Sequence, residues 1–555
     1  MVHRYSALAG LLATAAATPL SIRNDANQTM VRSFKDIPPS TDLKYVPCFD
    51  NFTCANIEVP LDYDNPDVGT TNVAFMRYDA PNQPAMGDII WNPGGPGDSA
   101  IEFMLEALEM LTFLLGDSYN IVGMDPRGVN NSGPNIDCFA GQPALRDYYL
   151  LELFNNIDPR SPILLEKYYQ DSGAFGTWCS QTLNASANYA NTPATATDML
   201  HYAELLAESQ GQSPEEAKVH YYGASYGSAL GTTFASLYPD RVGRFIIDAV
   251  LDVEDYYFGN WSQNLLQADK AVESFFRFCY EAGPKCAFFR NDSSADSIKQ
   301  RFDAMLEDLE DNPIAVTDVN FVQFPTTVTH IDFRGFLLIS LYNPPALFPS
   351  LAGIAAGLEN HNGTLLALAT GNGVMPSAEC DGTSPEVSSV QPKLLIACND
   401  NNKRFTVTEE NVTALFEYDK QLSTYVGDIW PAVIVPQCRN LDFAPPENQV
   451  FQKFEKVNTS TPILFTDNVI DPVTSSYEKM SAFYEGSVIL LQDAVGHGLV
   501  VTQAECTAGY VQKYLQTGEL PPPGTVCDTQ FEPFASTTSA KKRGLAPRGI
   551  PNIPF

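Results

Sequence analysis

Residues 218–231 read Lys-Val-His-Tyr-Tyr-Gly-Ala-Ser-Tyr-Gly-Ser-Ala-Leu-Gly, which places the pattern Gly-x-Ser-x-Gly between an apolar run and a run of small residues. The apolar run predicts a strand, and the small residues predict the start of a helix. A serine on a sharp turn in that context is strained, and the strain directs its Oγ toward solvent above the sheet. Gly223 and Gly227 leave room for neighbouring backbone at this turn. We therefore expect Ser225 to be a nucleophile, and the alternative is a chance pentapeptide in a loop.

Strand-like and helix-like segments alternate on both sides of this turn. This pattern predicts an α/β fold of the α/β-hydrolase class, a mostly parallel sheet with helices on both faces. Alternating apolar residues in 55–59 and 71–76 predict an antiparallel entrance to the sheet. Buried strands are expected at 88–91, 119–124, 244–250, 462–466 and 487–492.

Between the third and fourth of these strands the alternation gives way to helical segments, which predicts a largely helical cap inserted into the core. The expected organisation is a signal peptide at 1–17, a leader at 18–45, the first part of the core at 46–250, the cap at 251–437, the C-terminal part of the core at 438–530 and a disordered tail at 531–555.

The net charge and the N-terminal sequence limit where the protein is located and which partners it can have. The chain has 33 basic and 66 acidic residues, a net charge of −33, which disfavours nucleic acid and membrane surfaces as partners. His3 and Arg4 precede an apolar run that closes in three alanines, the layout of a secretory signal peptide. No later stretch offers eighteen uninterrupted apolar residues, so we predict no transmembrane helix and a secreted, extracellular protein.

Cysteines and glycosylation sequons agree with an oxidising compartment. Of the eleven cysteines, local spacing favours the pairs Cys48–Cys54, Cys138–Cys179, Cys279–Cys286 and Cys506–Cys527. Cys380, Cys398 and Cys438 remain, of which two can pair, and sequence alone does not fix this connectivity. The nine sequons are candidate glycosylation sites at Asn27, Asn51, Asn130, Asn184, Asn260, Asn291, Asn362, Asn411 and Asn458.

A serine nucleophile needs a base, and a base needs an acid to orient it. His497 lies between two glycines just after the last buried strand. The other histidines lie in the signal peptide, in helical or cap segments, or on the strand that leads into the turn at Ser225, which we call the elbow. Asp467 and Asp471 both follow the preceding strand. We prefer Asp471, because it lies beyond the turn and precedes a proline that fixes its backbone. The predicted triad is Ser225, Asp471 and His497, in the order nucleophile, acid, histidine found in α/β-hydrolases.

An oxyanion hole is expected from two backbone N–H groups. One belongs to Tyr226, which follows the nucleophile, and the other to Gly95 in the loop Asn92-Pro93-Gly94-Gly95-Pro96-Gly97. Asp125 and Arg127 fit a local ion pair that braces its own loop better than a catalytic role. No zinc-binding histidine pattern and no dinucleotide-binding glycine pattern is present, so we expect no metal and no cofactor.

Four motifs together resemble secreted α/β-hydrolases of the tripeptidyl aminopeptidase type, relatives of prolyl aminopeptidases in the serine peptidase S33 family. They are residues 92–97, Asp125-Pro126-Arg127-Gly128, residues 222–227 and Asp471-Pro472-Val473-Thr474, and the C-terminal region from Gly496 to Cys527 is also similar to that group. The resemblance covers about residues 45–530. It implies removal of short peptides or single residues from a free N-terminus. One departure is Asp98, where many relatives have a small residue, and it puts a charge near the cleft.

The leading hypothesis is therefore a secreted serine aminopeptidase that acts through an acyl-enzyme on peptides. A secreted esterase or lipase-like enzyme is the alternative, because the same triad cleaves esters. A non-catalytic binding module on this fold is the third hypothesis, although no triad member is missing. In prolyl aminopeptidases, carboxylates of the cap bind the substrate ammonium, but no motif transfers that role to Glu254, Asp255 or Glu273. The sequence leaves the oligomeric state open.

Overall fold

The computed structural model describes residues 30–155, 157–373, 388–403, 407–529 and 533–534. Its base is a ten-stranded sheet of order β1-β2-β3-β5-β4-β6-β7-β10-β11-β12. The strands are β1 (Val46–Cys48), β2 (Phe52–Pro60), β3 (Thr70–Tyr78), β4 (Asp88–Asn92), β5 (Asn120–Met124), β6 (Val219–Ala224), β7 (Val242–Asp248), β10 (Leu464–Ile470), β11 (Val488–Val495) and β12 (Val526–Cys527). β1 to β3 pair antiparallel, as does β3 with β5, and every pair from β5 to β12 is parallel. The predicted entrance and parallel sheet are confirmed.

Helices cover both faces of this sheet, and the elbow strand β6 shows why. Because side chains alternate along a strand, Tyr221 and Tyr222 point to opposite faces. Tyr221 joins the apolar cluster that includes Phe234 and Phe245, and Tyr222 joins the one that includes Val511. The helices that flank the sheet are α1 (Ala100–Leu115), α4 (Thr192–Ser209), α5 (Tyr226–Leu237), α14 (Tyr477–Ser481) and α15 (Glu505–Thr517). Burial on both faces fixes the register of the strand that carries the serine.

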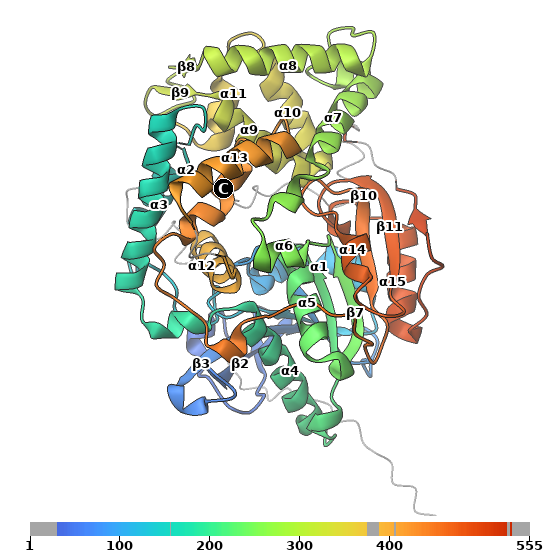
Figure 1. Ribbon diagram of the computed structural model, residues 1–555. Helices are drawn as coiled ribbons and strands as arrows, with labels where there is room; N and C mark the ends of the chain where they lie inside the picture. The colour runs from blue at the N-terminus through green and yellow to red at the C-terminus, as the bar shows by residue number, and fades with distance from the viewer. Residues whose placement is uncertain (1–29, 156, 374–387, 404–406, 530–532, 535–555) are drawn as a thin grey trace, which may run out of the picture.

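A helical body lies above the sheet in the view of Figure 1. Between β7 and β10 it contains α6 (Val253–Phe258), α7 (Ala268–Ala282), α8 (Ala295–Asp311), α9 (His330–Tyr342), α10 (Pro344–Leu358), α11 (Thr364–Thr370), α12 (Val390–Asp400), α13 (Glu409–Leu422) and the short pair β8 (Ile314–Val316) and β9 (Thr326–Val328). Two helices from before the elbow, α2 (Pro143–Asn155) and α3 (Pro162–Thr182), join it, and α3 contacts α13. The helical layer is therefore not built from residues 251–437 alone, and the predicted domain boundaries stay a prediction.

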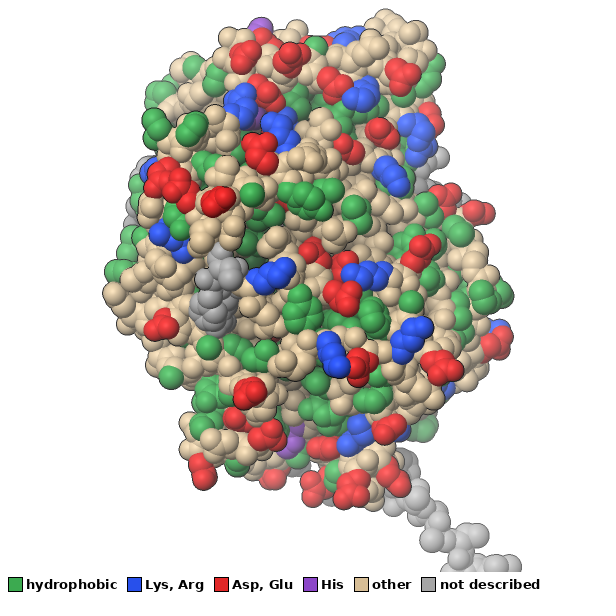
Figure 2. Space-filling model, viewed as in Figure 1, with side chains coloured by type: hydrophobic (Ala, Val, Ile, Leu, Met, Phe, Trp, Pro, Cys, Tyr) green, Lys and Arg blue, Asp and Glu red, His purple; other side chains and the backbone are tan. Residues whose placement is uncertain are grey.

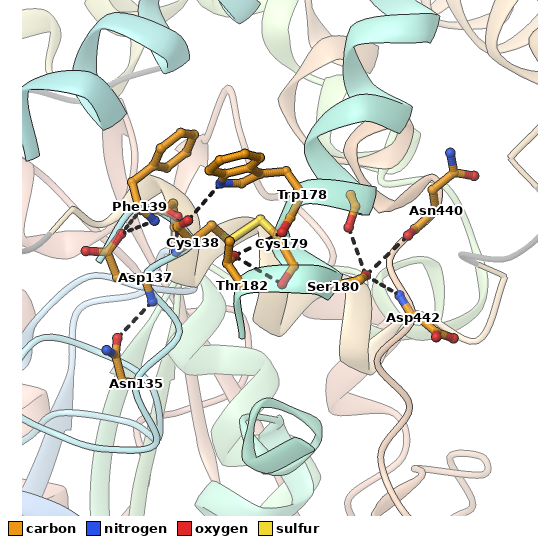
Figure 3. Close-up of a disulfide and its surroundings, with 12 residues drawn as sticks. Asn135, Asp137, Cys138, Phe139, Trp178, Cys179, Ser180, Thr182, Asn440 and Asp442 are labelled. Atoms are coloured by element: carbon orange, nitrogen blue, oxygen red, sulfur yellow. Dashed lines mark hydrogen bonds between the residues drawn. A yellow bond between two sulfur atoms is a disulfide. The ribbon is translucent and has the colours of Figure 1, made fainter. Parts of the chain in front are cut away.

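A disulfide and hydrogen bonds fasten α3 to two distant loops. Cys179 on α3 is bonded to Cys138, and the indole N–H of Trp178 donates to the Cys138 carbonyl at 2.8 Å (Figure 3). On the other side of α3, Ser180 Oγ accepts from the Asp442 backbone N–H at 2.8 Å. These contacts tie the helical body to the chain segments that lead into and out of the core.

The structure contains disulfides at all four predicted pairs and a fifth, Cys398–Cys438. The fifth pair joins α12 to the segment that returns to the core. The remaining cysteine, Cys380, lies outside the described residues, as do the predicted signal peptide, the leader up to residue 29 and the tail beyond residue 534.

Seven of the sequon asparagines are exposed: Asn51, Asn184, Asn260, Asn291, Asn362, Asn411 and Asn458. Asn130 differs, because it is half-buried and its amide nitrogen, the atom that a glycan would modify, donates to Ser99 Oγ at 3.2 Å. Asn27 lies outside the described residues. Acidic side chains spread over the visible face in Figure 2, with lysines and arginines between them. In the described ranges, no helix has both the length and the apolar character needed to cross a bilayer.

Candidate active site

The elbow has the backbone expected of a nucleophile turn. Ser225 follows β6 and precedes α5 with φ 59° and ψ −124°, a conformation that is strained for any residue other than glycine. A Cβ at Gly227 would lie 2.7 Å from the Asn92 carbonyl oxygen, so this position has no room for a side chain. Ser225 is only partly buried, and its hydroxyl lies beside the glycine loop that follows β4.

The structure brings Asp471 and His497 into direct contact. Both carboxylate oxygens of Asp471 lie 3.0 Å from His497 Nδ1. Three backbone N–H groups donate to the same carboxylate, those of Val473 at 2.9 Å, Thr474 at 2.8 Å and Gly498 at 3.1 Å. These donors fix the position of the carboxylate, which can then hold the imidazole with its proton on Nδ1.

The loop that carries His497 is held from two sides. The Asn468 amide donates to the carbonyls of Gly496 at 2.8 Å and Gly498 at 2.9 Å. From the helical body, the Tyr342 carbonyl accepts the His497 N–H at 3.0 Å, and the two rings meet edge to face with centroids 5.1 Å apart. These hydrogen bonds restrain the backbone of the histidine loop.

Asp467, the competing acid, does not contact His497. Its oxygens accept the N–H groups of Asn468 at 2.8 Å and Val250 at 3.1 Å. Burial raises the pKa of Asp467 well above its usual range, and the negative charges of Asp471 and Asp248 raise it further. Asp467 therefore makes its hydrogen bonds away from the imidazole and is not the acid that pairs with the histidine.

Asp248, at the end of β7, joins the serine turn to the histidine loop. Its carbonyl accepts the Ser225 N–H at 3.2 Å, and its Oδ2 accepts the Leu499 N–H at 3.0 Å. Burial raises the pKa of Asp248 to about 6, while hydrogen bonds from Leu499 and other groups act against that rise. In the part of the chain that the structure describes, no hydrogen bond joins Ser225 Oγ to His497 Nε2, and this nitrogen is buried without a partner. Catalytic hydrogen bonds are often long without substrate and tighten in the complex.

The two backbone N–H groups that are expected to form the oxyanion hole remain available to a substrate. Within the described residues, the N–H groups of Tyr226 and Gly95 make no hydrogen bond, whereas the Gly94 N–H donates to Asn92 Oδ1 at 3.0 Å. The Tyr226 side chain is fixed from the opposite side, since its hydroxyl and Thr192 Oγ1 are 2.6 Å apart and Thr192 in turn donates to Asp400 at 2.6 Å. The residue after the serine is thus anchored at its side chain while its N–H stays available.

Other residues that the sequence singled out have structural partners. Arg127 is fully buried and pairs with Asp198 at 2.7 Å, not with Asp125, so the predicted local ion pair was wrong. Asp125 instead accepts from Ser99 Oγ at 2.7 Å. The histidine on the elbow strand, His220, accepts the Arg244 N–H at 2.9 Å.

The sequence analysis missed Tyr342, Thr474 and Asp248. Thr474 Oγ1 lies 3.4 Å from His497 Nδ1, and it belongs to the quoted motif Asp-Pro-Val-Thr. Tyr342 ends α9, directly before the Asn-Pro-Pro break, which is the only sequence signal that marked this position. Nothing local marks Asp248, because its role depends on the strand order.

The site combines a strained serine, an Asp-His pair and two free backbone donors at the carboxyl edge of one sheet. This arrangement can remove a proton from a hydroxyl and stabilise a developing oxyanion, which is the chemistry of acyl transfer. Among the described side chains, no group of three or more His, Cys, Asp or Glu residues is placed to hold a metal ion.

Two family models match the chain: the α/β hydrolase fold over residues 89–294 and the TAP-like protein over residues 423–527. The serine protease Hip1 of Mycobacterium tuberculosis is 24% identical over 494 residues, which cover 85% of this chain and 87% of that protein. The tripeptidyl aminopeptidase of Streptomyces coelicolor is 28% identical over 225 residues, 40% of this chain and 38% of the relative. Carboxylesterase B of M. tuberculosis is 38% identical over 87 residues, which cover 15% and 16%.

Proposed function

Because this chain is an α/β-hydrolase of the tripeptidyl aminopeptidase type, we propose that it is a secreted serine aminopeptidase that releases short peptides or single residues from free N-termini. The observation that carries the proposal is the Asp471–His497 pair at the edge of the sheet where Ser225 is presented. A hydrolase that acts on peptides agrees with the names of the two peptidase relatives.

In the proposed first step, Ser225 Oγ attacks the carbonyl carbon of the scissile peptide bond while His497 Nε2 takes the hydroxyl proton. Asp471 holds Nδ1–H and stabilises the imidazolium, and the N–H groups of Tyr226 and Gly95 stabilise the oxyanion. His497 then gives its proton to the leaving amine as the C–N bond breaks, which leaves an ester on Ser225. Water hydrolyses that ester by the same steps, with His497 again as the base.

The proposed location is outside the cell. The N-terminal apolar run, the five disulfides and the exposed sequons support it. Mass spectrometry of protein collected from culture medium would identify the mature N-terminus and the glycosylated asparagines. Protein retained in the cell with residues 1–17 intact would contradict secretion.

A peptide anilide series tests the reaction. We expect cleavage of anilides that carry one to three residues with a free amine, slow cleavage of the N-acetylated counterparts, and loss of activity in Ser225→Ala. A fluorophosphonate probe should label the wild-type chain and not this variant. Labelling that persists without Ser225 would contradict its role as nucleophile.

Carboxylic-ester hydrolysis is the second candidate, because the same triad cleaves esters and one matched relative is a carboxylesterase. Short acyl esters belong in the same series. Turnover of esters alone, or equal turnover of free and acetylated peptides, would favour this candidate over the aminopeptidase. A chain that the probe does not label at all would favour the non-catalytic binding module.

A further inference from the structure

The glycine loop after β4 lies against the start of α12, a helix that comes from the other end of the chain. A Cβ at Gly97 would lie 2.5 Å from the Ser389 carbonyl oxygen and 2.6 Å from the Lys393 nitrogen. The next residue, Asp98, is the departure from the family pattern, and Lys393 lies one turn into α12. The contact therefore brings an acid and a base together at the rim of the oxyanion loop.

The Asp98 side chain is exposed to solvent beside the glycine loop. Nearby protein atoms raise the pKa of its carboxyl by desolvation, while the positive charge of Lys393 lowers it. In the described ranges, neither the Asp98 carboxylate nor the Lys393 ammonium makes a hydrogen bond or an ion pair, although Lys393 is half-buried. The Asp98 carboxylate is therefore exposed and has no protein partner among the described residues, so a cationic ligand can bind it directly.

This carboxylate lies near the nucleophile. A Cβ at Gly95 would lie 3.4 Å from Asp98 Cγ, and a Cβ at the adjacent Gly94 would lie 3.2 Å from Ser225 Oγ. Since neighbouring Cα atoms are about 3.8 Å apart, Asp98 Cγ is no more than roughly 13 Å from the serine hydroxyl. Asp98 and Asp471 both raise the pKa of Tyr342, after burial, and the ring of Tyr342 packs on His497.

This upper bound is within reach of a short peptide. An extended chain covers about 3.3–3.6 Å per residue, so even at the upper bound the α-ammonium of a chain of three residues can contact Asp98 while its last carbonyl lies at Ser225.

Two of the cap acids named in the sequence analysis already have partners. Glu254 pairs with Lys479 at 2.9 Å, and Asp255 accepts the backbone N–H groups of Asn260 at 3.0 Å and Gln263 at 2.9 Å. Glu273 is exposed on α7, and within the part of the chain that the structure describes no contact joins it to the glycine loop.

We propose that Asp98 binds the free α-ammonium of the substrate and so measures the length of the released peptide from the oxyanion loop. This inference rests on the proposed aminopeptidase function. The positive charge of Lys393 opposes the rise that burial causes in the pKa of Asp98, and the substrate ammonium supplies the partner that Asp98 lacks. The net charge of −33 adds long-range attraction for cationic termini.

The test compares wild-type enzyme, Asp98→Asn and the control Glu109→Gln, an acid-to-amide change on the exposed side of α1. A tripeptide anilide with a free amine and its N-acetyl counterpart are the substrates. We expect Asp98→Asn to lower kcat/KM for the free amine by roughly 10- to 100-fold and to leave the acetylated substrate unchanged. Glu109→Gln should behave as wild type. The rate of fluorophosphonate labelling should be equal in all three, because the probe carries no ammonium.

The test distinguishes failure of the aminopeptidase proposal from failure of the Asp98 inference. Wild-type enzyme that cleaves both substrates equally overturns the aminopeptidase proposal together with this inference. Wild-type enzyme that prefers the free amine, with Asp98→Asn keeping that preference, overturns this inference alone. Asp98→Glu retains the charge and is the second variant, so it should keep most of the selectivity. Loss of selectivity in Asp98→Glu equal to that in Asp98→Asn would also count against ammonium binding.

Discussion

Replacing Asp471 with asparagine tests how the histidine is oriented. Asp471 Oδ1 accepts two backbone N–H groups, from Val473 and Thr474, so the carbonyl oxygen of an asparagine would take its place. The new NH2 group would then stand where Oδ2 faces Gly498 N–H and His497 Nδ1. An NH2 group donates to Nδ1, so the imidazole proton moves to Nε2. A protonated Nε2 cannot accept the proton of the serine hydroxyl.

Two magnitudes follow from this geometry. The wrong tautomer removes general-base catalysis, for which we expect kcat to fall by about 10⁴-fold, roughly 5 kcal/mol of transition-state stabilisation. The Gly498 N–H loses its acceptor, which costs about 1–3 kcal/mol of stability in the histidine loop. Because the first effect is chemical and the second is structural, activity should fall far more than the melting temperature does.

The assay is kcat on the best anilide substrate, normalised to folded enzyme by circular dichroism, with Asp467→Asn as the matched control. Asp467 makes no hydrogen bond to His497, so its amide should keep kcat within about tenfold of wild type while it loses some stability through one unpaired backbone N–H. Our reasoning is refuted if Asp471→Asn keeps a tenth or more of the activity. It is refuted equally if the loss occurs in Asp467→Asn instead.

Three further changes have expected outcomes. Gly94→Ala forces a side chain onto a φ of +123° and puts its Cβ 2.7 Å from Ser225 Cβ, so we expect at least a hundredfold loss of kcat/KM at nearly unchanged secondary structure in circular dichroism. Asp419 is fully buried on α13, and burial raises its pKa to about 7, with Ser262 lowering it and Asp255 raising it to smaller extents. Because the unfolded chain ionises near pH 4, this group destabilises the fold as pH rises from about 4 to about 7, by up to roughly 4 kcal/mol. Thermal melts of Asp419→Asn should therefore gain stability over wild type at pH 8 relative to pH 5, and an equal difference at both pH values would contradict the shift. Removing Cys398–Cys438 by two alanines opens a loop of 40 residues and should cost about 4 kcal/mol by loop entropy, measured as a lower melting temperature. A melting temperature unchanged within a degree would contradict that disulfide.

The elbow and the histidine loop could be predicted because each is a local signal at the end of a strand. Gly-x-Ser-x-Gly after an apolar run fixes both the turn and the strain at Ser225, and the sheet then brings this turn to the same edge as the ends of β10 and β11. Three of the four predicted cysteine pairs are 6, 7 and 21 residues apart and follow from short separations in the same way. Cys138–Cys179 and Cys398–Cys438 are 41 and 40 residues apart, and the spacing left the partner of Cys438 open.

The rest of the site could not be predicted because it depends on strand order and helix docking. Asp248 reaches both Ser225 and Leu499 only because β7 lies between β6 and β10 in the sheet. Arg127 pairs with Asp198 on α4, which is 71 residues away in the sequence. The sequence argument had paired it with Asp125, two positions before it. Lys393 contacts the glycine loop because α12 packs against that loop. No sequence pattern in either segment predicts this contact.

The choice between the two acids shows how the chain sets one charge beside the imidazole. Asp467 and Asp471 lie four residues apart in the same acidic surroundings, so residue type does not distinguish them. Backbone donors do: Asp471 accepts three N–H groups, and two of them come from the turn that its own Asp-Pro-Val-Thr sequence forms. Pro472 has no N–H and a fixed φ, so the next two N–H groups fold back onto the Asp471 carboxylate. The Asp471 carboxylate is therefore held by three backbone donors beside the imidazole, whereas Asp467 has two donors, and burial and two acidic neighbours raise its pKa. The motif that resembles the family thus positions the acid next to His497.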